Sequence, residues 1–287
     1  MSGTIKGMTS RSRPFAQVDV FSAEPYRGNP VAVVLDGSGL TAEQMQRLAA
    51  WTNLSETTFV LPPRSTEADY GVRIFTPSGE LPCAGNPTLG TAHAWLESGG
   101  VPASDARVVQ ECEIGLVEMH RDDSRLSFRA PELLRSGELD PATLDQVAKA
   151  LRIPAGAIVA SQLVDNGPGW VAVQVASADE VLALEPDHAL LAELMVGVVG
   201  AYPAGSQHAF EVRGFAGRMG VPEDPVTGSL NAGLGQWLIA SGRAPASYEV
   251  SQGTQVGRRG VVSIASRDGG VWVGGASVTC IQGSVLI

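Results

Sequence analysis

The sequence predicts an α+β fold made of two pseudo-symmetric lobes, each with a mixed or antiparallel β-sheet wrapped around a central apolar helix. The first observation is a repeat, because residues 72–99 and 212–242 follow the same order: a strand, an Asn/Asp-Pro-x-x-Gly segment, and an apolar helix that closes on Trp-Leu and a glycine. Asn and Asp are preferred N-cap residues, and Pro fits the first helical position. We therefore expect Asn86 and Asp224 to cap the two helices.

Length and composition agree with this fold. A chain of 287 residues suits two domains of ordinary size, and 44% apolar residues are enough to fill two cores. The helix expected over 84–96 carries scarcely a charged residue, which indicates that it lies inside a sheet rather than on the surface.

Hydrophobic period and turn residues place the elements of the first half. Residues 15–21 alternate as in a half-buried strand, and Thr41 with Gln44 forms a capping box ahead of a helix that reaches about Trp51. The remaining elements expected here are strands at 31–35, 57–61 and 72–75 and the apolar helix at 84–96.

The second half reuses these parts. Asp140 and Pro141 start a helix with an apolar face, and Asp187 is expected to cap a helix that continues through Met195. Strands are expected at 170–175 and 210–215, followed by the second apolar helix and a Gly-rich tail with short β runs at 261–287. The predicted organisation is a flexible tail (1–13), a first lobe (14–130, completed by 270–287) and a second lobe (131–269).

Charge and motifs exclude several classes of protein. The net charge is −10 without a Lys/Arg cluster, which disfavours binding to nucleic acid or to an anionic membrane. No signal peptide or apolar run of membrane-spanning length occurs, so we expect a cytoplasmic protein. The three cysteines form neither a disulfide framework nor a zinc pattern, the histidines lack metal-ligand spacing, and no nucleotide loop is present. We expect no metal and no cofactor.

The repeated helix starts predict a site for a small anion. If a pseudo-twofold axis relates the halves, both positive helix ends face one crevice, and such ends bind carboxylates without a metal. The expected substrate-binding residues are therefore Gly85 and Asn86 in the first lobe and Gly228 and Ser229 in the second.

Several segments together resemble the PhzF-like phenazine-biosynthesis family. The segments that carry the resemblance occur in the family's order and lie at 15–21, 28–33, 53–60, 74–77, 80–92 and 223–229. The resemblance implies a diaminopimelate-epimerase-like fold with the active site between two lobes. It also implies an isomerase that moves a proton without a cofactor and works as a homodimer. The member that names the family isomerises dihydro-hydroxyanthranilate.

The resemblance also assigns roles to individual residues. Glu56 matches the catalytic acid/base of the family, and Asp224 matches an aspartate that binds substrate and holds the proton-donating geometry. Ser229, with the backbone amides around Gly85 and Gly228, would take the substrate carboxylate. Each residue has a structural alternative: Glu56 could complete a capping box, Asp224 could serve only as an N-cap, and Ser229 could be a small packing residue.

Two positions bear on the chemistry. The phenazine enzyme carries His where this chain has Asn86, and Asn cannot titrate near neutral pH, so a proton relay through this position is excluded. Racemases of the same fold use one thiol per lobe, but only Cys83 lies in a repeated segment, which disfavours that mechanism. Three functions remain open: an isomerase of a small carboxylate, a lyase or hydrolase on the same scaffold, and a noncatalytic carboxylate-binding protein.

Overall fold

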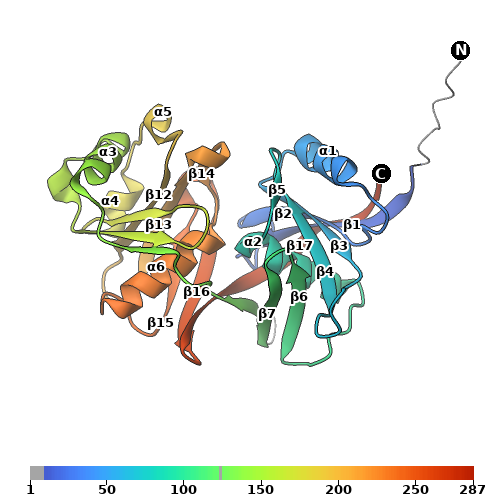
Figure 1. Ribbon diagram of the computed structural model, residues 1–287. Coiled ribbons are helices and arrows are strands. Elements are labelled where there is room, and N and C mark those ends of the chain that lie inside the picture. Colours follow the sequence, from blue (N-terminus) through green and yellow to red (C-terminus); the bar gives the residue numbers. More distant parts are fainter. Residues whose placement is uncertain (1–9, 123–124) are drawn as a thin grey trace, which may run out of the picture.

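The computed structural model describes residues 10–122 and 125–287 and consists of two lobes side by side (Figure 1). Within these residues no helix is both long and apolar enough to cross a membrane. The predicted flexible tail lies largely outside the described residues, and strand β1 already begins at Ser12. The elements of the first lobe are β1 (Ser12–Val20), β2 (Asn29–Val34), α1 (Ala42–Thr52), β3 (Glu56–Leu61), β4 (Tyr70–Phe75), β5 (Glu80–Leu81), α2 (Gly85–Glu97), β6 (Arg107–Cys112), β7 (Gly115–Asp122) and β8 (Arg125–Arg129).

The second lobe contains the same kinds of element in a similar order. They are β9 (Arg135–Gly137), α3 (Pro141–Leu151), η1 (Ala155–Ala157), β10 (Ala160–Asp165), β11 (Val171–Gln174), α4 (Ala178–Leu182), α5 (His188–Leu191), β12 (Met195–Ala201), β13 (Phe210–Ala216), η2 (Gly217–Met219), β14 (Val221–Asp224), α6 (Gly228–Ala240), β15 (Ser247–Gln252), η3 (Thr254–Val256), β16 (Gly260–Arg267) and β17 (Gly270–Leu286).

The strands of the first lobe close a ring around α2. Strand pairing runs from β1 through β2, β3, β4, β6, β7 and β8, and both β8 and β1 pair with β17. Helix α2 packs inside against strands of this ring and buries most of its residues. Because most of this helix meets apolar side chains, the scarcity of charged residues in its sequence is what this position requires.

The second lobe repeats the pairing pattern strand by strand. Its order β10, β11, β12, β13, β15, β16, β17 alternates antiparallel and parallel pairs in the same way as β1, β2, β3, β4, β6, β7, β8. Helix α6 occupies the place of α2 and contacts β10, β16 and β17. The prediction of a twofold-repeated α+β fold is confirmed.

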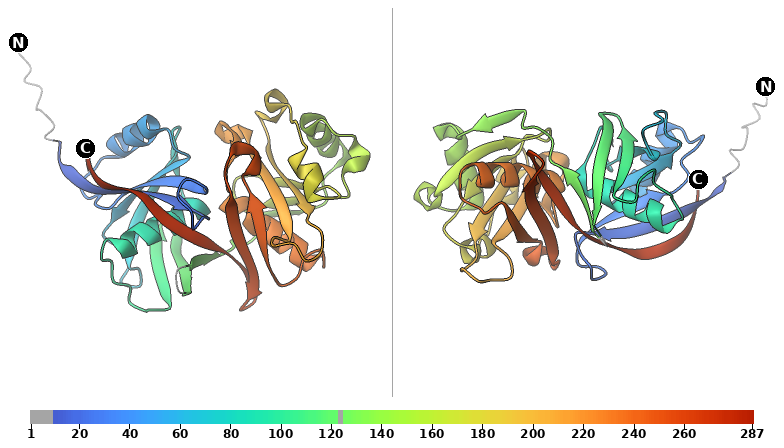
Figure 2. Two further views of the ribbon diagram at one scale, coloured as in Figure 1. Left: turned by 180° about the vertical axis from the view of Figure 1, so that it is seen from behind. Right: turned by 90° about the horizontal axis from the view of Figure 1, so that it is seen from below.

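Strand β17 belongs to both lobes. Its first residues pair with β16 of the second lobe, whereas Ser277 to Leu286 pair with β1 of the first, so that Ser12 lies opposite Leu286. Figure 2 shows this strand passing from one lobe to the other alongside β1.

The predicted caps of α1 and α3 are confirmed, but the helix predicted after Asp187 is wrong in length. Thr41 and Gln44 form the capping box of α1, and Asp140 accepts from the first amides of α3. Asp187 does cap α5, yet that helix ends at Leu191. Met195 is instead the first residue of β12, whose first six residues are all buried. This strand pairs with β11 and β13, so residues that we predicted to continue the helix form part of a sheet.

The predicted N-caps of the two central helices are also wrong. Helix α2 begins at Gly85 after Ala84, with Asn86 already inside its first turn. Helix α6 begins at Gly228 after Thr227, and Asp224 is the last residue of β14. Neither helix has a side-chain cap, because the N-cap position of α2 is Ala84, which has no polar side chain, and the hydroxyl of Thr227 at the N-cap of α6 donates to Asp224.

The repeat therefore has a different alignment from the one that the Asn/Asp-Pro motif suggests. Gly85 corresponds to Gly228, which aligns residues 80–85 with residues 223–228. Each copy holds an ion pair in the same place, Arg73 with Glu80 at 2.6 and 2.7 Å and Arg213 with Glu223 at 2.9 and 2.8 Å, joining the paired strands ahead of the helix.

Candidate active site

The two central helices meet end to end at the boundary between the lobes. A Cβ atom added to Gly85 would lie 3.3 Å from the Cα of Gly228, and one added to Gly228 would lie 3.2 Å from the Cα of Gly85. Glycine at both positions allows the backbones to approach this closely. The amide groups of both first helical turns, which no carbonyl of their own helix satisfies, are thereby brought together.

Glu56 is held at this boundary by Asn86. Glu56 is the first residue of β3, and Asn86 lies in the first turn of α2, where it is 4% exposed. The Asn86 Nδ2 atom donates to Glu56 Oε2 at 3.0 Å. Burial and the nearby charge of Asp224 raise the pKa of Glu56 to about 8, against the effect of the Asn86 hydrogen bond.

Asp224 is held at the same boundary by one residue from each lobe. Its Oδ2 atom accepts from the Thr227 hydroxyl at 2.7 Å, and its Oδ1 atom accepts from Asn29 Nδ2 at 2.9 Å. Burial raises the pKa of Asp224 to about 6, although both hydrogen bonds lower it. At neutral pH, Asp224 is therefore mainly ionised while Glu56 mainly keeps its proton.

Glu56 and Asp224 form an interacting pair across the lobe boundary. The charge on Asp224 is one of the causes that raise the pKa of Glu56, so the two groups titrate as a pair rather than independently. Two carboxyl groups whose environments separate their pKa values can act as a proton donor and a proton acceptor at one pH.

Ser229 lies next to Gly228 and is oriented by residues of the second lobe. Its Oγ atom accepts from Trp170 Nε1 at 3.0 Å, and its backbone oxygen accepts from Asn166 Nδ2 at 2.8 Å. Because the Ser229 hydroxyl accepts the hydrogen bond from Trp170, its own hydrogen is still available to be donated to a ligand.

The structure thus brings together all six site residues proposed from the sequence, at the ends of β3, β14, α2 and α6. The structure adds four residues to the site that were not predicted from the sequence: Asn29, Thr227, Asn166 and Trp170. Asn29 and Asn166 each lie next to Gly or Pro in a short polar segment. The local sequence of such a segment predicts a turn and gives no sign of a site. Their contacts lie 195 and 63 residues away along the chain.

A thiol pair across the lobes is not formed. Cys83 corresponds to Val226 in the aligned repeat, and its thiol lies against Cys112 of the same lobe. The hydrogen bond to Cys112 and burial raise the pKa of Cys83, which disfavours the thiolate that a racemase needs to remove a proton. In the part of the chain that the structure describes, no group of three or more His, Cys, Asp or Glu side chains could hold a metal ion.

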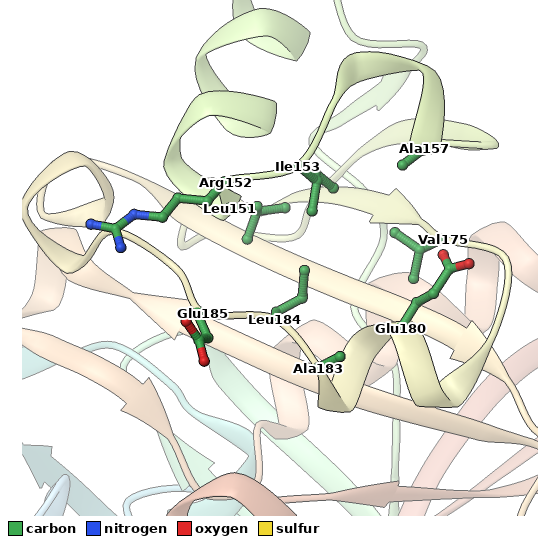
Figure 3. Close-up of a pocket in the computed structure, with 9 residues that line it drawn as sticks. All are labelled: Leu151, Arg152, Ile153, Ala157, Val175, Glu180, Ala183, Leu184 and Glu185. Atoms are coloured by element: carbon green, nitrogen blue, oxygen red, sulfur yellow. The ribbon is translucent and has the colours of Figure 1, made fainter.

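Two surface pockets lie elsewhere. One, of about 400 Å³, lies in the second lobe, and its lining includes Leu151, Leu184, Arg152 and Glu180 (Figure 3). Another, of about 840 Å³, lies on the first lobe. Neither is lined by the six site residues, which lie where the lobes pack against each other.

Comparison with known proteins identifies the family of the chain. The family model described as "Phenazine biosynthesis-like protein" matches residues 18–283. Antisense-enhancing sequence 1 of Schizosaccharomyces pombe is 38% identical over 98% of this chain and 100% of its own. Trans-2,3-dihydro-3-hydroxyanthranilate isomerase of Pseudomonas aeruginosa is 36% identical over 85% of this chain and 87% of its own. A crystal structure of a PhzF-family phenazine biosynthesis protein from Enterococcus faecalis shares the fold, with a TM-score of 0.80, 24% identity, and coverage of 96% of this chain and 100% of that one.

The two-lobed fold and the relatives named as isomerases define the class of protein as an isomerase. Since the family model spans nearly the whole chain, the protein belongs to the phenazine biosynthesis-like (PhzF) family.

Proposed function

We propose that the protein isomerises a small carboxylate metabolite by moving a proton, without a cofactor, at the boundary between the lobes. The observation that carries this proposal is the Glu56–Asp224 pair at the lobe boundary, where Asn86 donates to Glu56, and Asn29 and Thr227 donate to Asp224. Burial raises the pKa of both carboxyls, and the charge of Asp224 raises that of Glu56 further. This combination is what a general acid/base site needs, because the acid must hold a proton close to the operating pH.

In the proposed mechanism Glu56 is the proton shuttle. Its carboxyl group gives a proton to one carbon of the substrate, and the resulting carboxylate takes a proton from another carbon, so Glu56 ends as it began. Asp224 binds the substrate, and its negative charge keeps the Glu56 proton in place beforehand. Asn86 orients the Glu56 carboxyl through the 3.0 Å hydrogen bond.

The carboxylate of the substrate would be bound by the helix ends. The first-turn amides around Gly85 and Gly228 carry the positive ends of two helix dipoles, and the Ser229 hydroxyl is oriented by Trp170 so that its hydrogen is available. Such a site takes a small anion without any metal.

The substrate class follows from the relatives and from one difference. Relatives 34–36% identical are named for trans-2,3-dihydro-3-hydroxyanthranilate, an unsaturated cyclic carboxylate. The buried, uncharged Asn86 stands where the resemblance places a histidine. We therefore propose a related cyclic or unsaturated carboxylate as the substrate, turned over by a homodimer in the cytoplasm.

Proton exchange with solvent tests the function. The protein is incubated in deuterated water with trans-2,3-dihydro-3-hydroxyanthranilate and a panel of small unsaturated carboxylates, and C–H exchange is followed by NMR with product mass. An isomerase incorporates deuterium and leaves the rest of the product mass unchanged. A mass change would instead identify a lyase or hydrolase, and binding without exchange would identify a carboxylate-binding protein.

A further inference from the structure

We propose that Asn29 is a positioning residue that orients the Asp224 carboxylate from the opposite lobe. The inference rests on the proposed function, in which Asp224 acts beside Glu56. It gives a role to a residue that touches neither the helix ends nor Glu56 in the contacts described above.

Both side-chain hydrogen bonds of Asn29 are made to the other lobe. Asn29 is the first residue of β2 and is 1% exposed. Its Nδ2 atom donates to Asp224 Oδ1 at 2.9 Å and to the Val226 backbone oxygen at 2.8 Å. Because an amide nitrogen has two hydrogens, both donors are used on the segment that leads from β14 into α6.

The backbone that precedes Asn29 is held in place by hydrogen bonds and close packing. The position of the Asn29 side chain is therefore set independently of Asp224. The buried Asp19 carboxylate accepts from the amides of Arg27 and Gly28 at 2.7 and 2.8 Å. A Cβ at Gly28 would lie 2.0 Å from the Val20 oxygen, so the chain passes here as close as glycine allows. Asn29 is therefore a hydrogen-bond donor with a fixed position, and it determines where the Asp224 carboxylate lies.

Asn29 and Thr227 each donate a hydrogen bond to a different oxygen of the Asp224 carboxylate. Thr227 donates to Oδ2 from the same lobe, and Asn29 donates to Oδ1 from the other, so each oxygen has one donor and the plane of the carboxylate is set. Loss of Asn29 would leave Oδ1 without this donor, which would raise the pKa of Asp224 because the hydrogen bond lowers it.

Two charged groups bear on the surroundings of Asp224. Glu56 on β3 interacts with it electrostatically. Glu223, its neighbour on β14, is paired with Arg213 of β13 in an ion pair that is 5% and 8% exposed, and that pair is neutral as a unit. Burial raises the pKa of Asp224 most, and the hydrogen bonds from Thr227 and Asn29 lower it.

The test is a direct titration of Asp224 by carboxyl-carbon NMR in the full chain, with Asn29→Ala compared with Gln110→Ala. Gln110 is a matched control because it is also a fully buried amide, donating to Thr88 in the first lobe. We expect the Asp224 midpoint to rise by about one pH unit in Asn29→Ala, the scale of one hydrogen bond to a charged group, and to stay in place in Gln110→Ala. An unchanged midpoint in Asn29→Ala overturns the proposal.

Kinetics provide the second readout. In the proposed reaction the acid limb of the pH profile of kcat/KM should move upward with the Asp224 midpoint, by about one pH unit, so that kcat/KM falls about tenfold at pH values below that limb and changes least above it. If no compound is turned over, the proposed function fails while the NMR titration still decides the role of Asn29.

A measurement on the unmodified protein covers the case in which Asn29→Ala does not fold. The side-chain amide signals of Asn29 should shift as Asp224 titrates, with the same midpoint, since the two groups share a hydrogen bond. If the chemical shifts of the Asn29 amide stay constant while Asp224 titrates, the proposal is overturned.

Discussion

Gly85 and Gly228 face each other with their backbones in contact, each being the first residue of the helix at the centre of its lobe. This contact joins the two halves of the repeat at the place where Glu56, Asn86, Asp224 and Ser229 converge. A Cβ atom on Gly228 would require its neighbours to move by a few tenths of an ångström, and a Cβ atom on Gly85 would also lie 2.7 Å from the Phe128 ring.

Gly228→Ala should impair catalysis more than folding. The added Cβ would lie 3.2 Å from the Gly85 Cα and 3.3 Å from the Asn86 nitrogen, so the helix ends must separate by a few tenths of an ångström. Since misplacement by about 1 Å can cost roughly 10²-fold, we expect turnover to fall about tenfold with a nearly unchanged melting temperature. Gly156→Ala, which meets open space, is the control. Equal turnover in the two variants would contradict the importance of the contact.

Glu56→Gln should abolish most turnover while keeping the fold. Glutamine has the same shape and can still accept from Asn86, but it cannot carry a proton, so kcat should fall on the order of 10²–10⁴-fold. Steady-state kinetics and ligand binding by calorimetry are compared with Glu67→Gln at an exposed position. Near-normal turnover in Glu56→Gln would move the acid/base role to another residue.

The pH profile of kcat/KM should be bell-shaped. Asp224 must be ionised, which gives a rise through about pH 6, and Glu56 must be protonated, which gives a fall through about pH 8. Replacing Asp224 by Asn removes the charge that raises the pKa of Glu56, so the alkaline limb of the residual activity should move to lower pH. An alkaline limb that stays fixed would show that the two carboxyls do not interact.

Stability should depend on pH through Glu56 in a defined direction. The carboxyl ionises near 4.5 when unfolded and near 8 when folded, so between these values the unfolded chain binds fewer protons, and stability declines as pH rises. Glu56→Gln removes this decline. Urea denaturation should show the variant gaining stability over the natural protein between pH 4.5 and 8, on the order of 1–4 kcal/mol. A constant difference would argue against the raised pKa.

The natural protein should isomerise trans-2,3-dihydro-3-hydroxyanthranilate poorly, and Asn86→His should improve it. Both side chains can donate a hydrogen bond to Glu56, but only histidine can carry a proton at pH 6 to 7. Product formation and deuterium uptake are compared for the two proteins, with Asn86→Leu as the variant that lacks any donor. Efficient turnover by the natural protein would show that a histidine here is dispensable.

Local patterns predicted the elements whose causes are local. The capping box at Thr41 and the cap at Asp140 are short-range hydrogen bonds, and both are present in the structure. The Asn86 and Asp224 caps were wrong because neither residue stands at an N-cap position: α2 begins one residue before Asn86, and α6 begins four residues after Asp224. Their side chains bind Glu56, Asn29 and Thr227, and a cap motif gives no information about partners that lie far along the chain.

The alignment of the repeat could have been read correctly from a different motif. Residues 80–85 and 223–228 share Glu-x-Pro-x-x-Gly, and each glutamate follows an Arg-x-Phe strand with which it forms an ion pair. The order of the two carboxyl pKa values could not be read, because it depends on burial and on a charge that reaches Glu56 from the other lobe.

The sharing of β17 between the lobes limits how the chain can be made. The ring of the first lobe is closed by pairing of Ser12 to Val20 with Ser277 to Leu286. Most strands of the first lobe are synthesised before those of the second, yet the ring stays open until residues 277–286 have been made. The usual order in which an N-terminal domain folds first therefore does not apply to it. A nascent chain that has not reached residue 277 has a free edge at β1, and Ser277 to Leu286 act as the closing segment of a ring whose first strand is made before the whole second lobe.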